Sequence, residues 1–226
     1  MIDAVLFDAG GVLLMPSPEE LRRAVAPFGA VPDDERCRWV HYAATREVDR
    51  GGRPDWRSVD QYVARELGVP VERLEDALPA VREVYEELPW VPARGAASAL
   101  LALQAAGYAL AVVSNAGGTM EAQLATHDIC STNGDASARV AVVIDSAVVG
   151  VEKPDPAIFQ LALDAIGVPP ERCLYVGDTV YFDVNGARAA GIQPLHIDPY
   201  EACEIAGHPH VRRLDEIVDA LVDPDG

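Results

Sequence analysis

The chain is poor in positive charge. Its 18 lysine and arginine residues stand against 36 acidic residues, which gives a formal net charge of −18 at pH 7. A surface of that charge repels a nucleic-acid backbone and an anionic lipid surface, so we expect neither as a partner. Long apolar runs are also missing, and none approaches the length of a membrane span. Met1 leads directly into a core-like run, and we therefore expect no signal peptide.

Cysteine is scarce as well. The chain has four cysteines, which show neither a CxxC spacing nor dense pairing: Cys37, Cys130, Cys173 and Cys203. This usage is typical of reduced thiols in the cytoplasm. We therefore expect a cytoplasmic protein whose fold does not depend on disulfides.

Lysine is the rarest of the charged residues. Lys153 is the only lysine in the chain, and the other 17 of its 18 lysine and arginine residues are arginines. A compact ammonium and a planar guanidinium differ in size and in hydrogen-bonding geometry. A chain that uses arginine everywhere else marks position 153 as a place that needs the smaller group. Lys153 is therefore a candidate site residue on composition alone.

Short apolar runs rich in valine, isoleucine and leucine alternate with helix-like segments along most of the chain. Continuous rather than alternating apolar patterning is typical of parallel strands covered on both faces. The helix-like segments end at glycines that suit helix C-caps. The pattern predicts an α/β fold with a doubly wound parallel sheet. The predicted strands are Ala4–Phe7, Ala109–Val113, Ala141–Ile144, Cys173–Val176 and Pro194–Ile197, and the predicted helices are Ala93–Ala106, Pro156–Ile166 and Phe182–Ala190.

One part of the chain breaks this alternation. Residues 16–89 contain no clear strand and show helical patterns separated by proline and glycine. We expect two domains: an α/β core made of residues 1–15 and 90–226, and an all-helical cap of residues 16–89 inserted after the first strand. The predicted helices of the cap lie near 19–28, 33–49, 56–67 and 71–88.

Polar residues follow the predicted strands at the points where the strands end. Ligands of open parallel sheets bind beyond the carboxyl ends of the strands. We therefore expect these side chains to meet in one crevice. They are Asp8 after the first strand, Ser114 and Asn115 after the second, Lys153 after "SAVVGVE", and Asp178 with Asp183 after "CLYVG".

These residue types suit phosphoryl transfer. Carboxylates and a backbone carbonyl are hard oxygen ligands for Mg²⁺, which binds substrate phosphate as well. A carboxylate can also act as a nucleophile and form an aspartyl-phosphate. A lysine neutralises the charge crowded around the phosphoryl oxygens, and a serine hydroxyl binds those oxygens. The constellation predicts a Mg²⁺-dependent enzyme that acts on a small phosphorylated molecule.

Four stretches carry a family resemblance. "LFDAGGVL", "VVSNA", "GVEKPDPAIF" and "YVGDTVYFDVNGARAAG" resemble, in the same order, the four motifs of the haloacid dehalogenase-like hydrolases. The resemblance covers nearly the whole chain. It implies a Rossmann-like core, and the helical insertion resembles the family's type-one cap.

The resemblance also implies roles for the residues at the strand ends. Asp8 would be the nucleophile and a Mg²⁺ ligand, together with Asp178 and the backbone carbonyl of Gly10. Ser114, with Asn115 beside it, would bind the transferring group, and Lys153 would steady that group. Asp183 would lie behind the metal ligands or act through water.

Gly10 departs from the family's pattern. The phosphatases of the family usually carry a second aspartate there, which protonates the leaving oxygen and later activates water. Glycine keeps the carbonyl and removes the acid, a group typically worth about 10²–10⁴ in rate. A Mg²⁺-dependent phosphatase would then need a good leaving group, or a substitute acid from the cap such as His41.

Two alternatives remain open. A 2-haloacid dehalogenase also lacks the second aspartate, but it dispenses with Mg²⁺ and usually lacks the acid at the position of Asp178. The other alternative is a non-catalytic protein that binds Mg²⁺ and an anion without turnover. The sequence does not name the substrate, and it leaves open whether the protein is a monomer or a homodimer.

Overall fold

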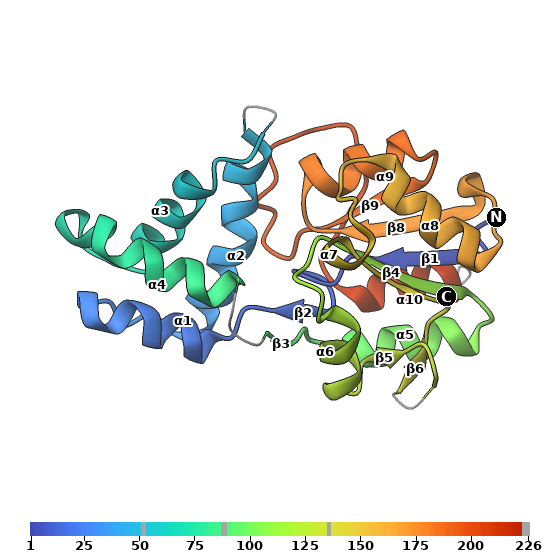
Figure 1. Ribbon diagram of the computed structural model, residues 1–226, viewed down its shortest axis with the longest axis horizontal. Coiled ribbons are helices and arrows are strands. Elements are labelled where there is room, and N and C mark those ends of the chain that lie inside the picture. Colours follow the sequence, from blue (N-terminus) through green and yellow to red (C-terminus); the bar gives the residue numbers. More distant parts are fainter. Residues whose placement is uncertain (51–52, 87–89, 135–136, 223–226) are drawn as a thin grey trace. The chain divides into compact units, whose positions relative to one another are not determined.

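The computed structural model describes residues 1–50, 53–86, 90–134 and 137–222 (Figure 1). The chain divides into two compact units. The first unit contains Met1–Leu14, Pro92–Pro199 and Ile205–Gly226, and the second contains Met15–Val91 and Tyr200–Glu204. The domain boundary predicted at residue 89 falls in segment 87–89, which lies outside the described residues.

The first unit is built on a six-stranded parallel sheet. The strand order is β10-β9-β8-β1-β4-β7, and every pair of neighbours runs parallel. The strands are β1 (Ala4–Phe7), β4 (Ala109–Ser114), β7 (Val143–Asp145), β8 (Cys173–Gly177), β9 (Gln193–Ile197) and β10 (His210–Val211). Because the order reverses around β1, the fold is the doubly wound sheet that the sequence predicts.

Helices cover both faces of this sheet (Figure 1). On one face, α8 (Pro156–Ile166) and α9 (Asn185–Ala189) pack on β1, β4 and β8, with Phe159 and Leu6 among the fully buried residues. On the other face lie α5 (Ala96–Ala105), which contacts β4, and α10 (Leu214–Val222), which contacts α5. Burial on both faces explains why β1 reads as an unbroken apolar run.

Some elements differ from the prediction. The segment predicted as one helix over Phe182–Ala190 consists of a π-helical turn, η5 (Val180–Val184), followed by α9. The edge strand β10 and helix α10 were not predicted. The two-residue strand is too short to show a period, whereas the apolar residues of α10 recur at i, i+3, i+4 and i+7 and could have indicated a helix. The remaining elements of the first unit are α6 (Met120–Thr126), β5 (Cys130–Ser131), β6 (Ala138–Arg139), α7 (Ser146–Val149) and η4 (Pro170–Arg172).

The second unit is helical. Its helices are α1 (Pro18–Val25), α2 (Asp34–Asp49), α3 (Trp56–Glu66) and α4 (Leu74–Glu86), with short 3₁₀ turns η1 (Ala26–Phe28) and η3 (Val71–Arg73). Asp33 caps α2 by accepting a hydrogen bond from Arg36 N at 2.7 Å. The segment Tyr200–Glu204 belongs to this unit because Tyr200 donates to Glu35 at 2.7 Å and Glu204 pairs with Arg46.

Two short strands, β2 (Leu14–Met15) and β3 (Val91–Pro92), pair where the chain passes between the units. In the part of the chain that the structure describes, no helix has the length and apolar character needed to cross a bilayer.

Candidate active site

Asp8 stands at the carboxyl end of the central strand. The residue before it, Phe7, pairs with Val112 of β4 and Val176 of β8, so Asp8 emerges between two neighbouring strands. Its backbone N donates to the Val176 carbonyl at 2.8 Å, and its Oδ1 accepts a hydrogen bond from Ala9 N at 2.7 Å. The side chain is therefore held at the sheet edge where strand-end ligands bind.

The two glycines after Asp8 form a tight turn. Gly11 has a φ of 71°, in the left-handed region that favours glycine. Its N donates to the Leu14 carbonyl at 2.8 Å, and Leu13 N donates to the Ala9 carbonyl at 2.8 Å. Gly10 forms a bridge with Leu14 in the same turn and contributes no side chain to the site.

Lys153 reaches two carboxylates from a buried position. Its Nζ lies 2.7 Å from Asp183 Oδ1 and 3.0 Å from Asp8 Oδ2. The same Nζ donates to the Tyr175 hydroxyl at 3.0 Å, so all three ammonium protons have acceptors. Only 2% of the side chain is exposed. The one lysine of the chain is thus enclosed by groups that accept hydrogen bonds.

Asn115 holds the backbone of Lys153. Its Oδ1 accepts from Lys153 N at 2.8 Å, and its Nδ2 donates to the Lys153 carbonyl at 3.0 Å. These two bonds tie the loop after β4 to the loop that carries the lysine. The neighbouring Ser114 ends β4 and is 3% exposed. The structure therefore brings Ser114 and Asn115 to the sheet edge, with the Asn115 amide engaged by Lys153.

Asp183 lies beneath the cluster, and both of its carboxylate oxygens accept hydrogen bonds. Its Oδ1 accepts from Lys153 Nζ and lies 3.1 Å from the Tyr175 hydroxyl, while its Oδ2 accepts from the N and the Oγ1 of Thr179 at 3.0 and 2.6 Å. The turn η5 folds this side chain back over the end of β8. A Cβ at Gly177 would lie only 2.3 Å from Asp183 Cβ, which explains the glycine at that position.

Asp178 completes a group of three acids. One carboxylate oxygen from each of Asp8, Asp178 and Asp183 lies within 4.8 Å of the others, and all three residues are buried. The backbone carbonyl of Asp178 accepts a hydrogen bond from His196 Nε2 at 2.9 Å. Since a carbonyl can only accept, this nitrogen of His196 carries the proton.

The acids and the lysine shift one another's pKa. Burial raises the pKa of Asp8 from 3.8 to about 7; Lys153 opposes this shift, and Asp183 and Asp178 add to it. Burial also disfavours ionised Asp183, but Lys153 and the bonds from Thr179 outweigh it and lower the pKa of Asp183. In Lys153, Asp183 and Asp8 outweigh burial and raise the pKa of the ammonium. Asp183 and Lys153 therefore form an ion pair in which both groups are charged. In Asp8, burial and the neighbouring carboxylates disfavour the ionised form.

Three residues of this region were missed in the sequence. Tyr175 lies inside an apolar run, but a buried phenol needs a partner, and that rule could have indicated it. Asp145 ends β7 and accepts from Gly118 N at 2.9 Å and Met120 N at 3.2 Å, which orders the loop after Asn115. It obeys the same strand-end rule as the other acids. Thr179 gave no signal, because its role depends on the fold of η5.

His41, named as a substitute acid, lies within the helical unit. It is 8% exposed, and its ring stacks on Tyr85 and contacts the edges of Tyr42 and Trp90. These contacts are those of a core histidine in that unit.

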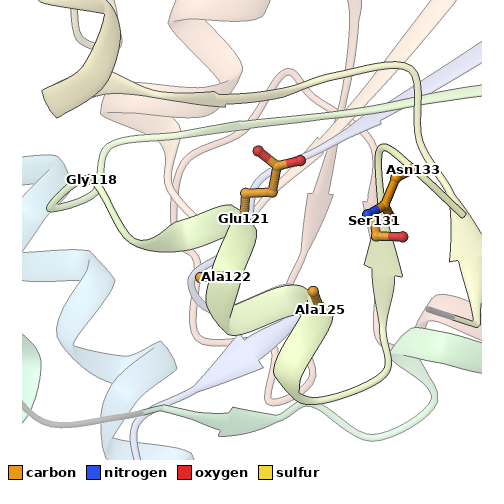
Figure 2. Close-up of a pocket in the computed structure, with 6 residues that line it drawn as sticks. All are labelled: Gly118, Glu121, Ala122, Ala125, Ser131 and Asn133. Atoms are coloured by element: carbon orange, nitrogen blue, oxygen red, sulfur yellow. The ribbon is translucent and has the colours of Figure 1, made fainter. Parts of the chain in front are cut away.

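A separate pocket lies between α6 and β5 (Figure 2). Its volume is about 520 Å³, and its lining includes Glu121, Ser131 and Asn133. Figure 2 shows the Glu121 side chain rising from α6. None of the predicted site residues lines this pocket, so the pocket and the acidic cluster are different features.

The sequence matches the haloacid dehalogenase-like hydrolase family over residues 2–191. It is 30% identical to a ribulose-1,5-bisphosphate 5-phosphatase of Halopiger xanaduensis, with 98% of this chain and 97% of that protein covered. Over 57 residues it is 47% identical to a phosphoserine phosphatase of Thermus thermophilus, covering 25% of this chain and only 23% of that phosphatase. The solved structure of a dehalogenase aligns with 97% of both chains, at a TM-score of 0.60 and 25% identity.

Proposed function

We propose that this chain, which belongs to the haloacid dehalogenase-like hydrolases, is a Mg²⁺-dependent phosphatase of small molecules that forms a phosphoryl intermediate on Asp8. The observation that carries the proposal is the buried pair of Asp8 and Lys153, 3.0 Å apart, inside a group of three acids. A carboxylate beside an ammonium is suited to attack a phosphoryl group whose oxygens the ammonium also attracts. Alignment with phosphatases over short and long stretches supports the same activity.

The acidic cluster fits a magnesium ion. The buried group contains three carboxylates, and the one ammonium beside it pairs with Asp8 and Asp183, which leaves a formal excess of two negative charges (3 − 1). Burial first, and then the neighbouring acids, raise the pKa of Asp8 and so disfavour its ionised form. A hard cation bound beside it would stabilise that ionised carboxylate. We assign the ligand role to Asp8, Asp178 and the Gly10 carbonyl. Asp183 is better suited to positioning, because its oxygens already accept hydrogen bonds from Lys153 and Thr179.

The side chains support a two-step reaction. An oxygen of Asp8 attacks phosphorus, and the bond to the leaving oxygen breaks with its electron pair. Water then attacks the phosphorus of the aspartyl-phosphate, which releases inorganic phosphate and restores the Asp8 carboxylate. Bound Mg²⁺ would reduce the repulsion between nucleophile and phosphoryl oxygens.

Other residues position these groups. The ammonium charge of Lys153 attracts the phosphoryl oxygens, while Asp183, Tyr175 and the Asn115 amide hold the residue in place. Ser114, at the end of β4, donates a hydrogen bond from its hydroxyl to the same oxygens. Because position 10 is a glycine, the leaving oxygen takes its proton from solvent. We therefore propose a substrate with a leaving group of low pKa, such as an acyl or aryl phosphate.

The test is a screen of acyl, aryl and alkyl phosphates with Mg²⁺ or with EDTA. We expect hydrolysis of acyl and aryl phosphates that needs Mg²⁺ and disappears in Asp8→Asn. Release of halide from a 2-haloacid in EDTA would favour the dehalogenase alternative instead. Absence of turnover across the panel, with Mg²⁺ still bound, would favour the non-catalytic alternative.

A further inference from the structure

Three of the five histidines of the chain meet at the edge of the sheet, outside the acidic cluster. His196 lies in β9 and His210 in the edge strand β10, where the two residues are directly paired across parallel strands. His208 lies two residues before His210, and the Pro209 carbonyl between them accepts from His196 N at 3.0 Å. The pairing of two strands therefore gathers residues that are well separated in the sequence.

The three rings face one another closely. Their centroids are 5.1 Å apart for His196 and His208, 4.9 Å for His196 and His210, and 4.4 Å for His208 and His210. One ring nitrogen from each lies within 4.8 Å of the others. In a tetrahedral zinc site with bonds of about 2.1 Å, ligand nitrogens are roughly 3.4 Å apart. Small side-chain movements would bring all three nitrogens to one ion.

The hydrogen bonds of His196 set its ring in the form that binds metals. Its Nε2 donates to the Asp178 carbonyl at 2.9 Å, so the Nδ1 of the neutral ring has a lone pair. That Nδ1 faces His208 Nε2 at 2.9 Å. Metal-binding histidines almost always donate their second ring N–H to a carbonyl or a carboxylate in this way. The ring is thus fixed with its lone pair directed into the cluster.

The surroundings favour neutral imidazole at His208. Burial lowers the pKa of His208 to about 4, and the neighbouring His196, His210 and Arg188 act in the same direction. A neutral ring is the form that coordinates a metal ion.

We propose that His196, His208 and His210 form a binding site for a divalent transition-metal ion of the zinc, nickel or copper class, distinct from the magnesium site of the acidic cluster. Imidazole nitrogens suit these ions, whereas carboxylates and carbonyls suit Mg²⁺. A set of three histidine nitrogens is a ligand set that holds zinc in proteins. The ion ties the edge strand β10 to β9 and fixes the ring behind the Asp178 backbone.

The test measures metal binding and needs no enzymatic turnover. Metal-stripped protein without a histidine tag is first saturated with Mg²⁺ to fill the acidic cluster, and is then titrated with ZnCl₂ in a calorimeter. We expect one zinc site per chain. His208→Gln and His210→Gln should each weaken it at least 10-fold, whereas His127→Gln, a control outside the cluster, should leave it unchanged. Far-UV circular dichroism checks that each variant is folded.

A spectroscopic measurement identifies the ligands. Co²⁺ added to the Mg²⁺-saturated protein should give the visible absorption of a tetrahedral ion, and this absorption should be lost in the double variant of His208→Gln and His210→Gln. It should persist in Asp178→Asn, whose backbone carbonyl is intact. Three results would overturn the proposal: no zinc binding at millimolar concentration, zinc binding that both histidine variants retain, or zinc that excess Mg²⁺ displaces.

Discussion

The Nζ of Lys153 lies 3.0 Å from Oδ2 of Asp8, and at most a tenth of either side chain is exposed. This contact joins the central strand to the loop before α8, and it places the one lysine of the chain against the proposed nucleophile. Tyr175 and Asp183 accept the remaining ammonium protons. Because each of its three protons has an acceptor, the Lys153 ammonium is held rigidly in the site.

The first prediction concerns the identity of the cation at position 153. A guanidinium is larger than an ammonium and cannot reach Asp8, Asp183 and Tyr175 in the same enclosed space. We expect Lys153→Arg to lower kcat by on the order of 10²-fold, the effect of a displacement of about 1 Å at a reacting centre. Arg172→Lys, a matching exchange at a half-exposed residue before β8, is the control. Turnover near that of the unmodified protein in Lys153→Arg would contradict a special role for lysine.

The second prediction concerns the glycine under Asp183. A methyl group at position 177 would lie 2.3 Å from both Cβ and Cγ of Asp183, so the strand or the turn η5 must shift. We expect Gly177→Ala to lower the free energy of unfolding by about 1–3 kcal/mol and to reduce turnover strongly. Gly117→Ala is the control, since nothing lies within 4 Å of its added Cβ. Equal unfolding midpoints in urea for both variants would refute the close contact.

The third prediction is a pH dependence of stability in EDTA. The pKa of Asp8 is raised to about 7 in the folded protein, by burial first and then by the neighbouring acids, from an ordinary value of 3.8. Between these values folded Asp8 binds a proton that the unfolded chain has released, so the contribution of Asp8 to stability falls as the pH rises from about 4 to about 7. The lowered pKa of Asp183 acts at lower pH. The pKa of His208, which burial lowers to about 4, acts within this window with the opposite sign, so a variant is needed to isolate the contribution of Asp8.

Asp8→Asn cannot titrate, and it isolates this contribution. We expect the variant to gain roughly 2–4 kcal/mol of stability relative to the unmodified protein between pH 4 and pH 7. Urea unfolding of both proteins at several pH values measures the difference. A difference that stays constant across this range would show that Asp8 is ionised throughout.

The fourth prediction concerns the missing acid. Gly10→Asp places a carboxyl where the phosphatases of the family usually have one, and alkyl phosphates need a proton on the leaving oxygen more than aryl phosphates do. We expect kcat/KM to rise by up to about 10²–10⁴ for alkyl phosphates and by much less for aryl phosphates. Gly10→Asn is the control, because it has nearly the same size without the acid. Equal gains in kcat/KM for alkyl and aryl phosphates would show that protonation of the leaving oxygen is not the step that the missing acid affects.

Much of the fold follows from local pattern. Continuous apolar runs identified β1, β4 and β8, and the rule that ligands bind at strand ends singled out Asp8 and Ser114. Lys153 was singled out by composition, and the expectation that it follows a strand was wrong, because the stretch before it contains helix α7. The edge strand β10 is only two residues long and has no apolar run to indicate it. A strand of this kind is defined by its partner rather than by its own sequence.

The contacts within the site depend on tertiary structure. The hydrogen bonds that Asp183 accepts from Thr179 follow from the π-helical turn η5, whereas the apolar pattern predicts an ordinary helix there. The spacing of His208 and His210 is visible in the sequence, but their meeting with His196 depends on the register of β9 and β10. Strand register between distant segments cannot be derived from residue spacing alone.

Trapping the phosphoryl intermediate is the sharpest test of Asp8 as the nucleophile. With glycine at position 10 no side chain there activates water, so hydrolysis of the aspartyl-phosphate should be slower than its formation from an aryl phosphate. Rapid acid quenching in Mg²⁺, followed by mass spectrometry, should find one phosphoryl group on the peptide that contains Asp8, and none in Asp8→Asn. Turnover of the aryl phosphate with no phosphoryl group on that peptide, or with the group on another residue, would show that Asp8 is not the nucleophile.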